Sequence, residues 1–465
     1  DLLALGTTNA AGRYDGGTGT DTLAFTANAP VVLSGLATGF ENVSLTGKAL
    51  TVTGVLGSNG APLGFGDGDT SLTIAKSATL AGVIDLGAGN DALRLSAGSI
   101  LQATVAGGAG NDSATLELAG NQTLAAGTLT GFETLASEGT GTLSLAGTQA
   151  YNQVNAATDL TIAAGSSLTA GQVAFTSGNQ RFTIAGTFAG AVDGGAGTDT
   201  IALSGGTAAA PVAFTNVANV EALAMTGGYA TVLGNAAFGS VDMSNGRLVG
   251  LANSAMSATQ FLVRQGATFG SAGTVNGNVT VAGILSPGAS PGTMTVNGNV
   301  TLNNGSLSYF ELTPTISDKL VVNGAMTINS GSTLQIVSSG AIRPGTSYDL
   351  IVASGGISGS YTTIQKPSDL FGFIVQRADR IQLLGQFLGD ARFSPQVARS
   401  IDYANATLAK QPATSTLFAA LPSLLTASGA SNAQGFAQVT PEAYASATQI
   451  GVDNALGLTQ AARGP

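Results

Sequence analysis

The sequence Thr-Val-Asn-Gly-Asn-Val-Thr occurs at residues 274–280 and again, unchanged, at 295–301. A looser copy, Val-Val-Asn-Gly-Ala-Met-Thr, follows at 321–327. Each copy alternates apolar and polar residues, as strands do, and its Asn-Gly pair tolerates the positive φ of a tight bend. A repeat of about 20 residues with strand patterns and no helical pattern predicts a β-solenoid. We therefore expect an all-β chain, a right-handed parallel β-helix whose full turns, here called coils, stack at roughly 4.8 Å.

Residues 1–270 carry a longer, weaker repeat made of two signatures. The first is a Gly-Gly-x-Gly-x-Asp turn, which occurs at 16–21, 107–112 and 194–199. The second follows each turn after about 20 to 25 residues, as Phe40-Glu41-Asn42-Val43, Phe132-Glu133-Thr134-Leu135 and Val220-Glu221-Ala222-Leu223. Successive turns are about four coils apart, if one coil takes roughly 22 residues. At that length per coil, residues 1–340 would form about 15 coils.

The composition of the 465 residues narrows the class of protein. Hydrophobic residues make up 44% of the chain, which excludes a disordered segment. The net charge is −10 and no basic cluster is present, which argues against a nucleic-acid partner. The chain has no Cys and no His, so it forms no disulfide and lacks the usual zinc ligands and general base. No apolar run reaches the roughly 18 residues of a membrane helix.

The pattern changes near the C-terminus. Residues 341–385 are rich in aromatics, and we expect this β segment to cap the open end of the solenoid; the aromatics are Tyr348, Tyr361, Phe371 and Phe373. Residues 386–465 carry helical patterns that begin at Ser394-Pro395, include 417–425 and resume at Thr440-Pro441-Glu442. We interpret 426–438 as a linker, and the helices as too few and too Ala-rich to form a firm core.

These residues resemble a known secretion system. Residues 273–336 resemble the passenger-associated transport repeat of Gram-negative autotransporters (type V secretion), including Ser286-Pro287-Gly288 and Asp318-Lys319-Leu320-Val321-Val322-Asn323-Gly324. Residues 341–384 are similar to the autochaperone segment of such passengers. Residues 390–463, especially Thr440-Pro441-Glu442-Ala443-Tyr444-Ala445-Ser446, resemble the linker helices that precede the outer-membrane β-barrel.

The resemblance implies a passenger at the cell surface or released from it, exported by its own C-terminal barrel, which these residues do not include. It implies domains 1–340 (β-helix passenger), 341–385 (autochaperone-like cap) and 386–465 (helical linker). The chain opens on Asp1-Leu2-Leu3 without the basic region of a signal peptide, so we interpret it as a mature or trimmed fragment.

Calcium is the one cofactor that the turns suggest. They resemble the calcium nonapeptide of repeat-in-toxin proteins, in which tandem copies share each ion. The full copies here are nearly four coils apart, but a partial copy at 86–91 lies one coil before that at 107–112. Asp91 and Asp112 should therefore stack on one corner and are the calcium candidates. The favoured alternative is that each aspartate shapes its turn by bonding to its own backbone.

Other patterns predict no catalytic residue. Gly288-Ala289-Ser290-Pro291-Gly292 matches the nucleophile-elbow spacing, but Pro291 disfavours the helix that an elbow needs. Asp67 and Asp69 form a close acidic pair, for which a loop turn is the favoured interpretation. Glu41, Glu133 and Glu221 recur at one repeat position and are expected to be structural.

The sequence therefore predicts a surface-exposed or released passenger without catalysis, cofactor or nucleic-acid partner. Its role would be structural or adhesive, through self-association or contact with neighbouring cell surfaces and their glycans. Two alternatives stay open: a β-helix enzyme that acts on polysaccharide, which would need clustered acids in a groove, and a calcium-stabilised protein like those of surface layers.

Overall fold

The computed structural model describes residues 1–289, 291–339, 347–367, 372–387, 389–408, 423–424, 426, 430–439, 449 and 452. The chain divides into two compact units, Asp1–Phe269 and Gly270–Pro465. The division lies where the long repeat of residues 1–270 ends. Each unit is built from stacked parallel coils, about 15 in all, so the predicted β-solenoid is confirmed.

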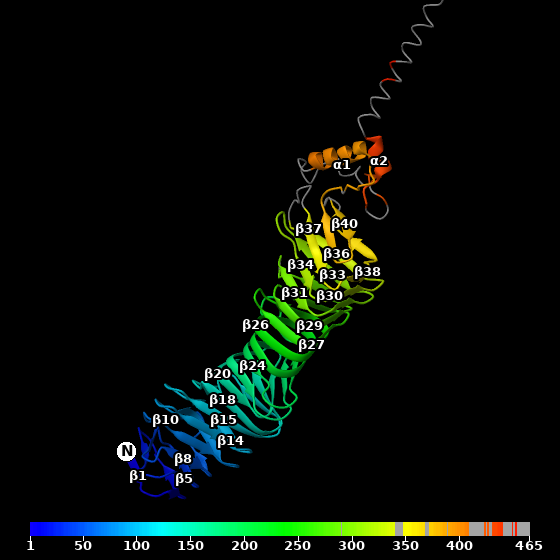
Figure 1. Cartoon of the computed structure of the whole chain (residues 1–465). Helices are drawn as coiled ribbons and strands as arrows, with labels where there is room; N and C mark the ends of the chain where they lie inside the picture. Colours follow the sequence, from blue (N-terminus) through cyan, green and yellow to red (C-terminus); the bar gives the residue numbers. More distant parts are fainter. Residues whose placement is uncertain are drawn as a thin grey trace, which may run out of the picture. The chain divides into compact units, whose positions relative to one another are not determined.

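Unit 1 consists of short strands separated by corners (Figure 1). Its strands are β1 (Leu2–Leu5), β2 (Asn9–Ala10), β3 (Arg13–Asp15), β4 (Thr22–Phe25), β5 (Val31–Leu33), β6 (Leu36–Thr38), β7 (Asn42–Leu45), β8 (Ala49–Val52), β9 (Val55–Leu56), β10 (Pro62–Phe65), β11 (Ser71–Ile74), β12 (Thr79–Asp85), β13 (Ala92–Leu95), β14 (Ile100–Ala106), β15 (Ser113–Ala119), β16 (Gln122–Ala125), β17 (Leu129–Thr130), β18 (Thr134–Thr140), β19 (Thr142–Ala146), β20 (Thr148–Ala156), β21 (Asp159–Ile162), β22 (Ser167–Phe175), β23 (Arg181–Ile184), β24 (Thr187–Asp193), β25 (Thr200–Leu203), β26 (Val212–Gly250) and β27 (Ala255–Val263), with β28 (Ala267–Ser271) at the division.

The core of unit 1 is a set of columns that run from coil to coil. Leu50 pairs in register with Leu72, which pairs with Leu93, and the column continues through Ala114 and Leu135. All five are at most 1% exposed. Because side chains alternate between the faces of a strand, the residues next to them face outward, and so the period-2 pattern of the sequence becomes one buried row per strand.

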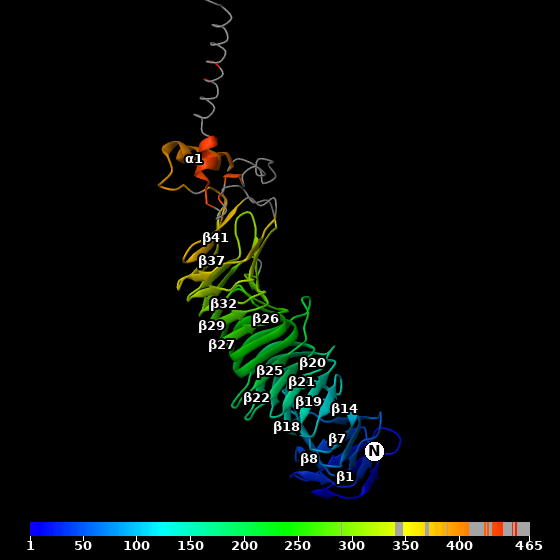
Figure 2. The ribbon, with the colours of Figure 1, turned by 90° about the vertical axis from the view of Figure 1, so that its right-hand side faces the viewer.

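The longest strand of unit 1, β26, bends as it runs through several corners (Figure 2). Its first part pairs with β24, its middle with β25 and its last part with β27, all in parallel. Asn219, Gly228 and Gly246 have positive φ inside it. These residues supply the backbone turns that let one uninterrupted strand follow the coils.

Unit 2 contains β29 (Thr274–Val281), β30 (Ile284–Pro287), β31 (Thr293–Asn297), β32 (Val300–Leu302), β33 (Leu307–Leu312), β34 (Lys319–Val322), β35 (Met326–Ile328), β36 (Thr333–Ser338), β37 (Tyr348–Ala353), β38 (Ile357–Gly359), β39 (Thr363–Gln365), β40 (Phe373–Gln376) and β41 (Arg380–Leu384). The first two copies of the repeated sequence pair in register, so that identical residues lie on each other: Thr274 pairs with Thr295 and Val279 with Val300. The third copy pairs with the second in the same register, Val300 with Met326.

In the second and third copies the Asn-Gly pair lies at a bend between two strands, β31 and β32 in one and β34 and β35 in the other. Of Gly277, Gly298 and Gly324, only Gly277 has a positive φ. A Cβ on Gly298 would overlap the carbonyl oxygen of Gly277, and one on Gly324 would overlap that of Gly298. The predicted bends are therefore present without a positive φ at Gly298 or Gly324, and glycine is needed at these two positions because neighbouring coils approach closely.

The asparagines beside them form a side-chain ladder. The amide of Asn297 donates to Asn276 at 2.7 Å, and that of Asn323 donates to Asn297 at 2.8 Å. Identical amides one coil apart can each donate to one neighbour and accept from the other. This accounts for the return of Asn at the same position of each copy.

The segment after residue 346 continues the solenoid and then ends it. Strands β37, β38 and β39 pair in parallel with β34, β35 and β36. Strand β41 then pairs antiparallel with β37, and β40 antiparallel with β41. This reversal covers the edge of β37, as expected of a β cap. Tyr348 is buried and donates to the carbonyl of Thr313, whereas Phe371 and the side chain of Phe373 lie outside the described residues.

Two helices follow the cap, α1 (Pro395–Leu408) and α2 (Ala433–Gln438). The Ser394 hydroxyl accepts from the N–H of Val397, so α1 begins as the sequence predicts. Segments 417–422 and 440–448 lie outside the described residues, as do Ser290 and Pro344.

The helices correct two expectations. Phe387 and Phe436 meet edge to face at 4.9 Å and form a small core with Val397 and Ile401, so the tail does pack. Helix α2 also lies inside 426–438, the segment expected to be a linker. Within the described part of the chain, no helix has the length and apolar character needed to cross a membrane.

Candidate functional site

Three turns of unit 1 stack as one corner, at residues 66–70, 87–91 and 108–112. Ala88 and Ala109 form a parallel bridge within it. Asp91 and Asp112 are both 1% exposed and lie in successive coils. The sequence-based expectation that these two aspartates share a corner is therefore met.

Three carboxylates of this corner, the buried Asp91 and Asp112 and the half-buried Glu133, bind backbone N–H groups of the preceding coil. Asp91 accepts from the N–H of Thr70 at 2.6 Å, Asp112 from that of Asp91 at 2.7 Å, and Glu133 from that of Asp112 at 2.7 Å. We call this series of carboxylate-to-backbone bonds, from Thr70 through Asp91 and Asp112 to Glu133, the acid ladder. A carboxylate that accepts a backbone N–H forms a charge-assisted bond, stronger than a bond between neutral groups.

The acid ladder explains why the two sequence signatures occur together. Glu41 accepts from the N–H of Asp21 at 2.8 Å, and Glu221 accepts from that of Asp199 at 2.6 Å. In each case, as at Asp112, the glutamate of the second signature covers the aspartate of the first from the next coil. The three glutamates thus occupy the structural positions that their recurrence indicates.

The favoured interpretation of the turn aspartates needs one correction. Asp91 and Asp112 bond to a neighbouring coil and not to their own turns. The aspartates that do shape their own turns stand earlier: Asp85 accepts from the N–H of Gly87 at 3.1 Å, and Asp193 from that of Gly195 at 3.0 Å. The spacing along the sequence does not tell which aspartate has which role. The role depends on which N–H groups of the neighbouring coil lie within bonding distance, and only the folded structure shows this.

The capacity of the corner for calcium is small. One oxygen of Asp91 and of Asp112 holds an N–H, and the other is buried with no hydrogen-bond donor among the described residues. Burial raises the pKa of Asp91, the Thr70 N–H opposes this in part, and Asp112 adds to the rise. No group of three or more potential metal-binding side chains occurs in the described ranges. Calcium needs about six to eight oxygens, so this pair would supply only part of a site.

Asp67 and Asp69 line a cavity of about 110 Å³ together with Lys48. Asp69 accepts from the N–H of Asn90 at 3.0 Å and lies 3.6 Å from the Lys48 ammonium. The Asn90 N–H and then Lys48 hold the pKa of Asp69 below its usual range. A carboxylate stabilised in its charged form is a poor general acid, which is consistent with a turn role.

A cluster that sequence reasoning missed lies on the outer face of three successive coils. The Arg94 guanidinium donates to Glu138 at 2.8 Å and to Glu117 at 3.4 Å. Glu117 and Glu138 are paired in register on β15 and β18. The pKa of Arg94 is raised, and the main cause is its hydrogen bond to Glu138. The 21-residue interval between the glutamates equals one coil and was the available signal.

A groove of about 290 Å³ adjoins this cluster. Its polar lining includes Glu117, Ser96, Ser99, Asn121 and Gln122. Strand neighbours are about 4.8 Å apart, close to the roughly 5–5.5 Å that separates the two carboxylates of retaining glycosidases. Of the two glutamates, Glu117 lines this groove.

The nucleophile-elbow match has a different structure. Strand β30 ends at Pro287, and strand β31, not a helix, begins at Thr293. Gly288 has φ 80° and lies against the carboxylate of Asp318, which accepts from the N–H groups of Gly292 at 2.9 Å and Glu311 at 2.8 Å. Asp318 is 1% exposed, and burial raises its pKa to about 6. The loop is thus anchored by the aspartate of the Asp-Lys-Leu phrase.

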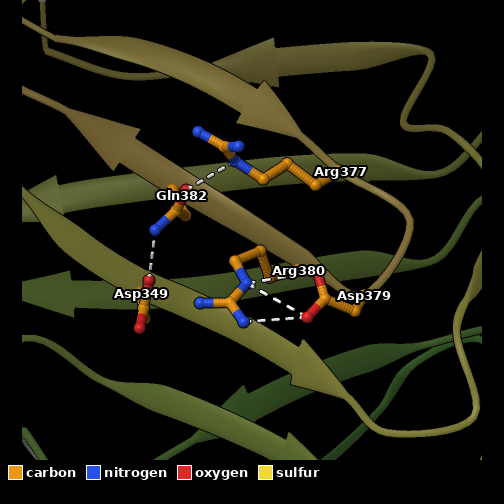
Figure 3. A network of polar contacts seen from close by, with 5 residues as sticks. All are labelled: Asp349, Arg377, Asp379, Arg380 and Gln382. Atoms are coloured by element: carbon orange, nitrogen blue, oxygen red, sulfur yellow. Dashed lines mark hydrogen bonds and ion pairs between the residues drawn. The ribbon is translucent and has the colours of Figure 1, made fainter.

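The cap carries a polar network on β37 and β41 (Figure 3). Gln382 donates to Asp349 at 2.6 Å and accepts from Arg377 at 3.2 Å. The neighbouring Arg380 pairs with Asp379 at 2.8 Å and is the main cause of the lowered pKa of that carboxyl. Asp349 and Gln382 are paired across the antiparallel strands, so the network ties the capping strand to the last coil.

Comparison of the chain with family models and with curated proteins found no match.

Proposed function

We propose that the chain is an autotransporter passenger, exposed at or released from a Gram-negative cell surface, with a structural and adhesive role. The proposal rests first on the resemblance of residues 273–463. Two observations support it: Asp318 anchors the Ser-Pro-Gly loop, and β41 closes antiparallel over β37, so both of the motifs that carry the resemblance have a structural role.

The observation that carries the non-catalytic role is the acid ladder. Five acids of unit 1 accept backbone N–H groups from a neighbouring coil, at distances of 2.6 to 2.8 Å. Of these, Asp91 and Asp112 are buried. Side chains occupied in this way hold the scaffold together. An outer surface of small Thr, Ser, Asn and Gly side chains suits many shallow contacts with sugars, cell surfaces or other copies of the chain.

The test uses the purified full chain. We expect the mean particle mass in light scattering to rise with protein concentration, and we expect cells that display the chain to aggregate. Polysaccharide and ester substrates should show no turnover. A chain that stays monomeric over the whole concentration range, with no cell aggregation, would contradict the proposal.

The second candidate is an enzyme acting on polysaccharide, and the Arg94–Glu117–Glu138 cluster beside its groove is the observation that favours it. A panel of neutral and acidic polysaccharides, assayed for new reducing ends and for unsaturated products, tests it. Turnover that is lost in both Glu117→Gln and Glu138→Gln, and kept in Glu311→Gln, would establish this alternative.

A further inference from the structure

One sheet of unit 1 ends inside the solenoid. Strand β17 (Leu129–Thr130) pairs with β14 and with no later strand among those described. In the next coil, β20 pairs with β18 and β22 instead. A cavity of about 230 Å³ lies where this ladder stops, lined by Gly127 and by residues 129–132 and 148–151.

The cavity has buried side chains in its floor and a hydroxyl rim, and its accessible lining is more polar than apolar. Leu129, Phe132 and Tyr151 line it and are buried, whereas the lining residues Thr130 and Thr148 are exposed. No lining residue carries a charge. Small-molecule sites have a few placed polar groups and volumes of roughly 300–1,000 Å³, and this cavity lies just below that range.

The polar part of the floor is held in place before any ligand arrives. The Tyr151 hydroxyl donates to the Gln149 side-chain oxygen at 2.9 Å. The Gln149 amide donates to the carbonyls of Leu124 at 2.8 Å and Ala146 at 3.2 Å. Burial raises the pKa of Tyr151 to about 12, so the hydroxyl stays protonated and its oxygen can accept a further bond.

We propose that this cavity binds one ring of a neutral saccharide. A sugar ring carries a rim of hydroxyls, which Thr130, Thr148 and the Tyr151 oxygen would meet. The uncharged lining selects a neutral ring over a uronic or sialic acid, because a desolvated carboxylate would have no cationic partner. The inference rests on the adhesive role proposed above and names its ligand class.

The experiment is saturation-transfer NMR on the full chain with D-glucose, D-galactose, N-acetyl-D-glucosamine and their short oligomers, with D-galacturonic acid as the charged comparison. Protein concentrations are kept where light scattering shows monomers, so the result does not depend on assembly. Ala150→Leu places a larger side chain at the exposed lining of the cavity, and Ala209→Leu is the matched change on an exposed loop elsewhere.

We expect at least one neutral sugar to bind, Ala150→Leu to abolish its signal, and Ala209→Leu to keep it. Thr148→Val, which removes a single hydroxyl, should weaken binding roughly threefold to tenfold, and this measurement decides the question if Ala150→Leu fails to fold. The inference is overturned if no neutral sugar binds, or if neither cavity variant changes the affinity. Cell aggregation that persists without sugar binding would refute this inference and leave the adhesive role standing.

Discussion

At the scale of single residues, the same side chain does different work at different corners. Asp85 closes its own turn, whereas Asp91, six residues later, accepts an N–H from the coil before it. The difference follows from burial: Asp91 is almost completely enclosed, and its bonded oxygen finds its donor in the neighbouring coil.

The first prediction concerns Asp112. Asp112→Ala leaves the buried N–H of Asp91 without an acceptor, which should lower the free energy of unfolding by about 1–3 kcal/mol. Asp112→Asn keeps an acceptor oxygen and should cost less. Chemical denaturation of the two variants measures the difference, and equal stability of Asp112→Ala and the unmodified chain would show that the acid ladder is dispensable.

The second prediction concerns metal at the same corner. Because the oxygens of Asp91 and Asp112 are few and partly occupied, a chelator should leave the melting temperature unchanged. The thermal melt is recorded with chelator and with added calcium. A calcium-dependent rise of several degrees that Asp112→Ala abolishes would instead establish the calcium-stabilised alternative.

The third prediction is a pH dependence from Asp318. Its pKa is raised by burial from 3.8 to about 6 in the folded chain, so the folded state binds this proton more tightly than the unfolded state. The free energy of unfolding should therefore fall as the pH rises from about 4 to about 6, by about 3 kcal/mol at most.

The control for Asp318 is Asp318→Asn, which cannot titrate. Asp91 and Asp199, whose pKa values burial also raises, remain in both proteins, and so the difference between the two pH profiles isolates Asp318. Denaturation midpoints measured across this pH range supply both profiles. Parallel profiles would show that Asp318 does not titrate in this range.

At the scale of elements, stacking in register decides which residues a strand can carry. Residues 274–327 contain two columns that require each copy to lie directly on the previous one. One is the ladder of asparagine amides, and the other is the column of glycines, whose close approach leaves no room for a Cβ. A slip by one residue would turn the buried valines outward and break both columns. The regular repeat is thus a consequence of contacts between neighbouring coils.

The fourth prediction concerns the cap. Deletion of residues 341–384 removes β37 to β41 and exposes the parallel edges of β34, β35 and β36. We expect the remaining coils to become sensitive to protease, because an open edge frays and can pair with other chains. Limited proteolysis measures this, with deletion of residues 390–465 as the control that should leave the coils resistant. Unchanged resistance after loss of the cap would contradict a capping role.

At the scale of the whole molecule, charge opposes the contact of one copy with another. The chain has 26 acidic and 16 basic residues and a net charge of −10. Like charges on neighbouring copies repel over roughly 10 Å at 0.1 M salt and over about 3 Å at 1 M. Close contact through small uncharged side chains should therefore become easier as salt rises.

The fifth prediction follows from this balance. The protein concentration at which the full chain begins to assemble should fall as sodium chloride rises from low salt to about 1 M, where the Debye length is shortest. Light scattering over a concentration series at each salt level measures the onset. Assemblies that dissolve as salt rises would show that ion pairs between copies, and not uncharged surfaces, hold them together.

The sequence by itself determined the solenoid, because a repeat of about 21 residues with alternating strands leaves few other ways to bury one row of side chains per strand. It also determined that Asp91 and Asp112 share a corner and that α1 begins at Pro395. These conclusions needed only spacing along the chain, and spacing in a solenoid translates directly into position.

Only the tertiary structure decided what each polar group binds. The pairing of Asp112 with Glu133, the cluster of Arg94 with Glu117 and Glu138, and the end of the sheet at β17 all join residues of different coils. The physical reason is that hydrogen bonds and cavities depend on distances of a few ångströms between coils. The sequence period sets which coils are neighbours but not how their side chains meet.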